Sequence, residues 1–402
     1  MSIKNQSAAG SFSEHPAALS RSHLLLMATA AGVGIANLYY NQPLLNQMTQ
    51  DLESDPVSIG LVPSLTQAGY AIGMLLLVPL GDMIARRKLV ILAAALATAM
   101  LLGTAFSSGA HAVLVFSVLL GLFNMTPQLL IPLAAQLAAP DKRGQAVGVM
   151  LSGAFAGVLL SRTVAGFVGS EWGWRYLYIG AAALQAMLLV ALYRALPENQ
   201  PSYSGRYVDL LKTIMYLLRD QPVLREACLF GATLFGAFMV FWSSLIHLMS
   251  AAPFNLGPNS VGLYGILGAG AALLSPIAGR IADRGYARRF AGLMVMLTIL
   301  SFGIFWEWKT SLIGIGVGVL AMDLGVQLAH VANQSRILHL APHAQSRIQT
   351  AYMTAYFGGG GIGAATGTLA WRSSGWAGVC IAAILLLCIP LLRWFLPLKN
   401  AK

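Results

Sequence analysis

Apolar segments of about 20 residues recur along the whole chain, and each is long enough as a helix to cross the roughly 30 Å hydrocarbon core of a bilayer. The segments lack the alternation of apolar and polar residues that transmembrane strands show. The sequence therefore predicts an all-α membrane protein with twelve transmembrane helices. The predicted spans are 24–49, 57–80, 89–107, 112–138, 146–169, 176–194, 225–250, 258–279, 290–306, 311–335, 348–371 and 376–397.

Composition agrees with a lipid environment. Hydrophobic residues make up 57% of the chain and charged residues only 10%, whereas a soluble domain carries about 25% charged residues. The net charge of +11 would favour nucleic acid as a partner in a soluble protein. No basic, aromatic-rich soluble segment exists here to bind it, so nucleic acid is excluded and the lipid bilayer is the expected surrounding.

The basic residues are distributed unevenly between the two sides of the predicted spans. Of the 25 Lys and Arg residues, only Arg175, Lys309 and Arg372 fall in loops on one side, and only Arg162 falls inside a span. The others occupy the tails and loops of the opposite side, which marks that side as cytoplasmic. The sequence therefore predicts a multi-pass protein of the inner membrane with both termini in the cytoplasm. Residues 1–23 lack the features of a signal peptide and are expected to form a cytoplasmic tail.

The two halves of the sequence repeat the same landmarks. Asp82 corresponds to Asp283 at an offset of 201 residues, and Gly173 corresponds to Gly375 at an offset of 202, each glycine being followed by Trp. Such a repeat predicts two six-helix bundles, 24–194 and 225–397, related by a pseudo-two-fold axis. Residues 195–224 form the cytoplasmic connection, in which 207–219 is amphipathic, and residues 398–402 form a cytoplasmic tail.

The repeated loops carry a family resemblance. GRIADRGYARR (279–289) closely resembles the Gly-x-x-x-Asp-Arg-x-Gly-Arg-Arg signature of the major facilitator superfamily, and PLGDMIARRK (79–88) is a degenerate copy. NLYYNQPLL (37–45), GWRYLY (173–178) and DLGVQLAHVANQSRI (323–337) are similar to a bacterial efflux-permease branch of that family. The resemblance implies the twelve-helix fold of that family and transport of a small-molecule substrate by alternating access.

The resemblance also implies a latch between helix ends on the cytoplasmic side. In the family, the matching Asp pairs with a nearby Arg and faces the N-terminal end of a helix in the other half, where a carboxylate is favoured. Asp82 with Arg86 or Arg87 would form this latch. Gly279, Asp283, Arg284 and Arg288 would form a partial counterpart in the second half. The alternative is that these charges only end helices and follow the general preference of basic residues for the cytoplasmic side.

Two charges remain inside predicted spans, Arg162 and Asp323. An ionisable residue within the membrane is costly and therefore a functional candidate. Burial disfavours the charged form of a carboxyl group, so Asp323, near the membrane midplane, is a candidate for proton coupling. Its alternative role is structural, as a hydrogen-bonded Asp. Arg162 could pair with Asp323, bind an anionic substrate group or extend to the outer membrane surface.

The resemblance places spans one, four, seven and ten around a central cavity. Polar and aromatic residues within these spans suit an amphipathic solute, and packing between helices is the alternative role for each. The substrate candidates are Tyr39, Tyr40, Asn41, Asn124, Gln128, Phe241, Trp242, Gln327 and His330. Span four lacks the Arg that drug–proton antiporters of the family usually carry, and Gly157 is followed by Val158 where those antiporters have Gly-Pro.

The sequence favours secondary transport over enzymatic activity. It contains no Gly-Lys dipeptide, no nucleophile elbow and no metal-ligand cluster, so no cofactor is expected. The preferred function is proton-coupled efflux of a small solute by a monomer, with protons as the second partner. The alternative is uptake or facilitated diffusion of a sugar-like or organic-anion solute without proton antiport.

Overall fold

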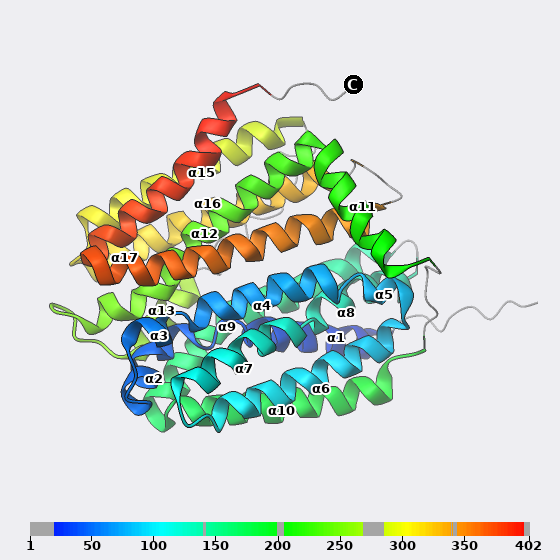
Figure 1. Cartoon of the computed structure of the whole chain (residues 1–402), viewed down its shortest axis with the longest axis horizontal. Helices are drawn as coiled ribbons and strands as arrows, with labels where there is room; N and C mark the ends of the chain where they lie inside the picture. The colour runs from blue at the N-terminus through cyan, green and yellow to red at the C-terminus, as the bar shows by residue number, and fades with distance from the viewer. Residues whose placement is uncertain are drawn as a thin grey trace, which may run out of the picture.

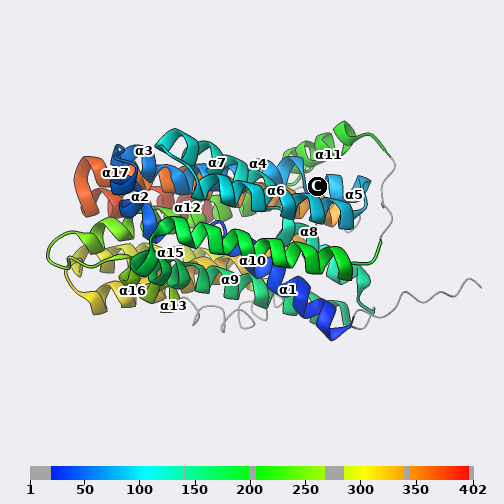
Figure 2. The ribbon, with the colours of Figure 1, turned by 90° about the horizontal axis from the view of Figure 1, so that it is seen from below.

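The computed structural model describes residues 20–139, 142–198, 205–267, 285–338, 340 and 344–397. These residues form helices and loops without strands, as predicted. Within the described residues, nine helical segments are long and apolar enough to span a bilayer; two of them, Pro56–Met83 and Ala110–Leu137, consist of several shorter helices. Most helices run along the long axis of the molecule, with one group above and one below in Figure 1; the view from below shows the same direction of the helices (Figure 2).

The first group of helices contains the residues before the central connection. Its members are α1 (Arg21–Ala36), η1 (Gln42–Leu44), α2 (Leu45–Asp51), α3 (Pro56–Gly60), α4 (Val62–Leu76), α5 (Leu80–Met83), α6 (Arg86–Ala105), α7 (Ala110–Phe123), α8 (Thr126–Leu137), α9 (Arg143–Trp172) and α10 (Trp174–Ala195). Within the group, α1 packs on α9, α4 packs on α7, and α6 packs on α10.

The second group follows the amphipathic helix α11 (Tyr207–Asp220), which matches the predicted amphipathic segment. Its members are α12 (Pro222–Ser250), α13 (Pro258–Leu267), α15 (Ala287–Glu307), α16 (Leu312–Leu338) and α17 (Gln345–Phe395). The predicted eighth span is described only as far as Leu267. The 51 residues of α17 contain the last two predicted spans, and a kink at Ser374 and Gly375 separates the two spans.

The kink in α17 falls at the glycine that the internal repeat equates with Gly173. Gly375 has φ of 57° and Gly173 has φ of 91°, a left-handed conformation that other residues adopt at a cost. Each glycine separates two consecutive helices, and the following Trp174 and Trp376 are both buried. The repeat noted in the sequence is therefore a repeat of backbone geometry at this position.

Two predicted spans are interrupted rather than continuous. The predicted span 24–49 breaks after Ala36 and resumes at η1, where Pro43 is an early residue. The predicted span 112–138 breaks at Asn124 and resumes as α8, with Pro127 in its first turn. Proline favours a helix start because its missing N–H would be unpaired there anyway. Both breaks leave backbone groups outside the regular helical hydrogen-bond pattern, where side chains can bind them: Asn124 Nδ2 donates to the Gly34 carbonyl.

Glycines allow two helix pairs to approach within backbone contact. In the first group, a Cβ added to Gly157 of α9 would lie 2.0 Å from the carbonyl oxygen of Gly32 in α1. In the second group, a Cβ on Gly363 of α17 would lie 2.0 Å from the carbonyl oxygen of Gly236 in α12. These glycines therefore serve close helix packing, as small residues do in membranes.

Replacing Gly157 by alanine is expected to destabilise the protein by about 1–3 kcal/mol, since α1 and α9 must separate to accept the methyl group. Gly180 in α10 is the matched control, because a Cβ there meets nothing within 4 Å and alanine favours a helix by up to about 1 kcal/mol. Thermal unfolding of the purified variants in detergent measures both. A Gly157→Ala variant as stable as Gly180→Ala would contradict the close approach of α1 and α9.

The two groups meet through α4 against α17 and α9 against α13. We call outer the end at which α3 begins, following the predicted topology. Hydrogen bonds join the groups toward this end: Ser64 Oγ donates to the Gly361 carbonyl (2.7 Å), and Thr368 Oγ1 to that of Gly60 (2.8 Å). Asn46 Nδ2 also donates to Ser250 Oγ, at 2.9 Å. The outer ends of the two groups are therefore closed against each other.

Candidate functional site

A buried arginine lies where the two groups of helices meet. Arg162 of α9 is only 2% exposed, and its Nε donates a hydrogen bond of 2.6 Å to Gln42 Oε1. Three aromatic rings surround the guanidinium. Its central carbon lies 3.9 Å from the ring centroid of Trp242, 5.0 Å from that of Tyr39 and 5.4 Å from that of Phe238. At such distances the ring faces attract the cation.

The ring enclosure is built from both groups. Tyr39 and Gln42 belong to the interrupted first span, and Phe238 and Trp242 are one turn apart on α12. The break after Ala36 turns the chain so that both residues of the first span reach Arg162. Of the roles considered from the sequence, extension of Arg162 to the outer membrane surface is wrong for this structure, since the side chain is covered by protein.

Asp323 of α16 is the acidic counterpart. It is 8% exposed, its charge interacts with that of Arg162, and the indole N–H of Trp242 is directed toward it. The two charged residues, both described, form no ion pair within 4.0 Å. Asp323 Oδ1, Arg162 Nη2 and Trp242 Nε1 each lack a hydrogen-bond partner in the protein. An opposite pair of buried charges thus lies close together with unused hydrogen-bonding capacity.

Amide side chains lie around this pair. Gln67 of α4 interacts with the hydroxyl of Tyr39, although neither amide atom of Gln67 forms a hydrogen bond of normal geometry. Gln327 lies one turn after Asp323 on α16, is only partly buried, and leaves its Nε2 unpartnered. Hydrogen-bond donors and acceptors are therefore both available near the buried charges.

The other first-group candidates bind within their own group. Asn124 Nδ2 donates to the Gly34 carbonyl at 2.5 Å, which ties the break between α7 and α8 to α1. Asn41 Nδ2 donates to Thr66 Oγ1 at 3.3 Å, and Gln128 Nε2 donates to the Tyr70 hydroxyl at 3.0 Å. Tyr40 is buried and interacts with Tyr178 of α10. These four residues hold helices together in this structure.

The second-group candidates divide between core and interface. Phe241 is fully buried and stacks on Phe305 with ring centroids 4.3 Å apart, so it belongs to the core of the second group. His330 is half-buried: its Nδ1 is 3.0 Å from the Tyr352 hydroxyl and its Nε2 is 2.8 Å from Gln334 Nε2. Trp242 and Gln327 are therefore the second-group candidates that accompany Arg162 and Asp323.

Asp82 and Arg86, two of the latch candidates, form an ion pair. Arg86 Nη2 lies 2.8 Å from Asp82 Oδ1, and Arg86 Nε donates to the Gly81 carbonyl at 3.2 Å. Arg87 instead donates to the Tyr193 carbonyl (2.8 Å) and to Glu198. Each of these contacts joins an arginine to a backbone carbonyl or a carboxylate within residues 81–198.

The second latch copy is only partly described. Gly279, Asp283 and Arg284 lie outside the described residues. Arg288, expected to pair with Asp283, instead donates to Glu226 from Nε and Nη2, with Nη2 3.0 Å from Glu226 Oε1.

Glu226 is the centre of a charged cluster that the sequence did not reveal. Its carboxylate is fully buried near the start of α12 and also binds Arg336 of α16 and Arg393 of α17, the latter at 3.6 Å. Arg288 further donates to the Leu396 carbonyl at 2.7 Å. One acid thus joins the inner ends of α12, α15, α16 and α17. Its only sequence signal was an acidic residue early in a predicted span.

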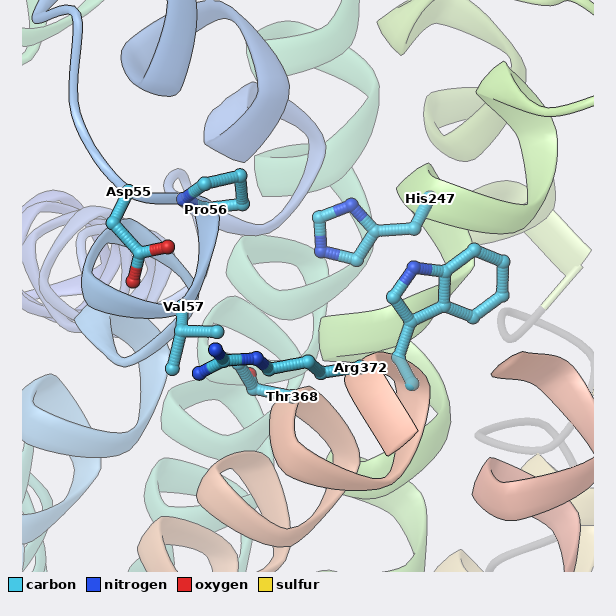
Figure 3. A pocket seen from close by; sticks show the side chains of 7 residues that line it. Asp55, Pro56, Val57, His247, Thr368 and Arg372 are labelled. Atoms are coloured by element: carbon cyan, nitrogen blue, oxygen red, sulfur yellow. The ribbon is translucent and has the colours of Figure 1, made fainter. Parts of the chain in front are cut away.

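A cavity of about 250 Å³ lies at the outer end between the groups. Figure 3 shows Asp55 and Pro56 of the first group facing His247 and Arg372 of the second. Val57, Thr368 and Trp371 complete the lining, and His247 stacks on Trp371 with ring centroids 5.7 Å apart.

Opposite charges buried between two groups of apolar helices are typical of substrate and ion pathways in membrane proteins. The family model of the Major Facilitator Superfamily matches residues 24–364. The chain therefore belongs to the major facilitator superfamily, and it is a transporter of a small solute rather than an enzyme.

Individual relatives agree with this assignment. The "Uncharacterized transporter YgaY" of Escherichia coli O157:H7 is 38% identical over 377 residues, which cover 94% of this chain and 96% of that protein. A "Probable sugar efflux transporter" of Pasteurella multocida is 25% identical over 262 residues, 63% of this chain and 61% of that protein. The fold matches a crystal structure of a bacterial homologue of the human lysosomal transporter Spinster, inward-facing and occupied, with a TM-score of 0.72, 13% identity and coverage of 94% and 97% of the two chains.

Proposed function

We propose that the protein is a proton-coupled exporter that moves a small solute out of the cell by alternating access. The observation that carries the proposal is a pair of buried charges, one from each group of helices. Arg162 lies beneath the rings of Tyr39, Phe238 and Trp242, and Asp323 lies near enough to interact with it electrostatically. A change in the charge of one residue alters its interaction with the other group. Such a change can therefore bias the relative position of the groups.

Asp323 would couple the two fluxes by binding either a proton or the solute. A buried carboxylate without a partner is costly, so the empty, unprotonated site is the least favourable state. A proton neutralises Asp323 directly, whereas a solute does so through hydrogen bonds or charge. Because the two compete for one side chain, they cross the membrane in opposite directions.

Efflux is supported by the relative from Pasteurella multocida, which is named "Probable sugar efflux transporter". We further propose that the two groups are the moving six-helix domains, 24–194 and 225–397. The protein would be a monomer in the inner membrane with both termini in the cytoplasm, and the Asp82–Arg86 pair would act in the latch between the domains. Uptake or facilitated diffusion is the competing function.

Reconstituted vesicles with an imposed pH gradient test the proposal, using a solute found by thermal-shift screening of the purified protein. Export driven against the solute gradient by inward proton flow is the expected result. A solute flux of equal rate with and without the pH gradient would instead establish facilitated diffusion.

A further inference from the structure

We infer that the transported solute is zwitterionic, a small molecule with one carboxylate and one ammonium group. This inference deepens the proposed function and depends on it for the role of the central site. The site offers one buried cation, Arg162, and one buried anion, Asp323, which interact electrostatically without forming an ion pair. A solute that carries both charges can compensate both residues at once.

The carboxylate would bind at the free edge of Arg162. Aromatic rings lie over the guanidinium, and Gln42 occupies Nε. Nη2 remains a buried donor without a partner. A carboxylate oxygen is a strong acceptor for a guanidinium N–H, because both partners are charged.

The ammonium group would bind Asp323, whose Oδ1 is a buried acceptor without a partner. The unpartnered Nε2 of Gln327 and Nε1 of Trp242 can donate hydrogen bonds to the solute carboxylate and to the Asp323 carboxylate, and so orient both groups. The rings of Phe238 and Trp242 supply an apolar wall for the rest of the solute, as in other small-molecule sites.

Other solute charges fit this site less well. A solute with only a negative charge, bound at Arg162, would repel Asp323 and leave it without a partner. A solute with only a positive charge, bound at Asp323, would repel Arg162 and leave it without a partner. A neutral polyol would compensate neither charge. The ammonium group of a zwitterion and a proton compete for Asp323, which agrees with exchange of one for the other.

The outer cavity repeats this pairing of charges from opposite groups. Asp55 belongs to the first group and Arg372 to the second; both line the cavity and, though both are described, form no ion pair (Figure 3). The cavity volume of about 250 Å³ is below the roughly 300–1,000 Å³ of drug-sized sites. This volume suits a small solute.

Binding to the purified full chain in detergent, measured by calorimetry without any pH gradient, tests the inference. The probes are L-leucine and L-phenylalanine, with N-acetyl-L-phenylalanine lacking the cation, L-phenylalanine amide lacking the anion, and glucose lacking both. We expect at least one free amino acid to bind about 10- to 100-fold more tightly than either blocked derivative, the value of one charged hydrogen bond. Glucose or a blocked derivative binding as tightly, or no binding of either amino acid, would overturn the inference.

Two variants assign the charges. Asp323→Asn should bind phenylalanine and its N-acetyl derivative with similar affinity, and Arg162→Gln should bind phenylalanine and its amide with similar affinity. Asp209→Asn, on the exposed face of α11, should retain the full preference for the free amino acid. Amino acid binding without proton-driven export would refute the proposed function alone, whereas proton-driven export of glucose would refute the zwitterion alone.

Discussion

Asp323→Asn is expected to abolish solute transport driven by a pH gradient while leaving solute exchange intact at saturating solute concentration. Asparagine has the shape of aspartic acid but carries neither the charge nor the exchangeable proton. The variant therefore resembles the protonated site permanently. Its two groups of helices can still switch between the inward-open and outward-open states around a bound solute, but proton flow no longer drives this switch.

Proteoliposomes that contain the variant provide the measurement. Solute flux with the pH gradient should fall to the rate seen without a gradient. Exchange of labelled for unlabelled solute should continue, which also shows that the variant is folded. Asp209→Asn is the matched control, since it makes the same chemical change at an exposed ion pair of α11. Proton-driven transport at the wild-type rate in Asp323→Asn would rule out Asp323 as the coupling residue.

Glu226→Gln is expected to destabilise the second group by about 3–5 kcal/mol, the cost of leaving buried charges without their partner. In the wild type, one buried carboxylate compensates Arg288, Arg336 and Arg393. Glutamine keeps the shape of the side chain, yet three guanidinium groups then repel one another at the inner ends of α12, α15, α16 and α17.

Unfolding of the purified variant in mixed micelles measures this effect. Asp209→Asn again serves as the control, because its partner Arg206 is 81% exposed and such surface pairs contribute no more than about 1 kcal/mol. A loss of stability in Glu226→Gln no larger than in Asp209→Asn would show that the cluster does not hold the four helix ends together.

Span lengths predicted much of the fold, because lipid imposes them on any helical membrane protein. The expected span 176–194 appears as α10 (Trp174–Ala195), and the amphipathic segment 207–219 as α11 (Tyr207–Asp220). Gly173 and Gly375 matched as a repeat in the sequence and share a left-handed backbone in the structure.

The detailed surroundings of the candidate site could not be predicted in this way. Arg162 was identified as an intramembrane charge, but the rings that cover it come from Tyr39, Phe238 and Trp242, far apart along the chain. The preference of basic residues for the cytoplasmic side already explained Arg288, Arg336 and Arg393. Nothing in their sequence positions therefore indicated that Glu226 joins them. Such contacts depend on how helices pack, which hydropathy and spacing do not determine.

Proton movement in wild-type proteoliposomes, with a solute gradient as the sole driving force, tests the central claim most directly. Coupling is reciprocal, so a solute that flows down its gradient must drive protons in the opposite direction. A pH-sensitive dye inside the vesicles should therefore report acidification as solute leaves. Proton flow in the same direction as the solute, or no proton flow during transport, would contradict the proposed proton-coupled export.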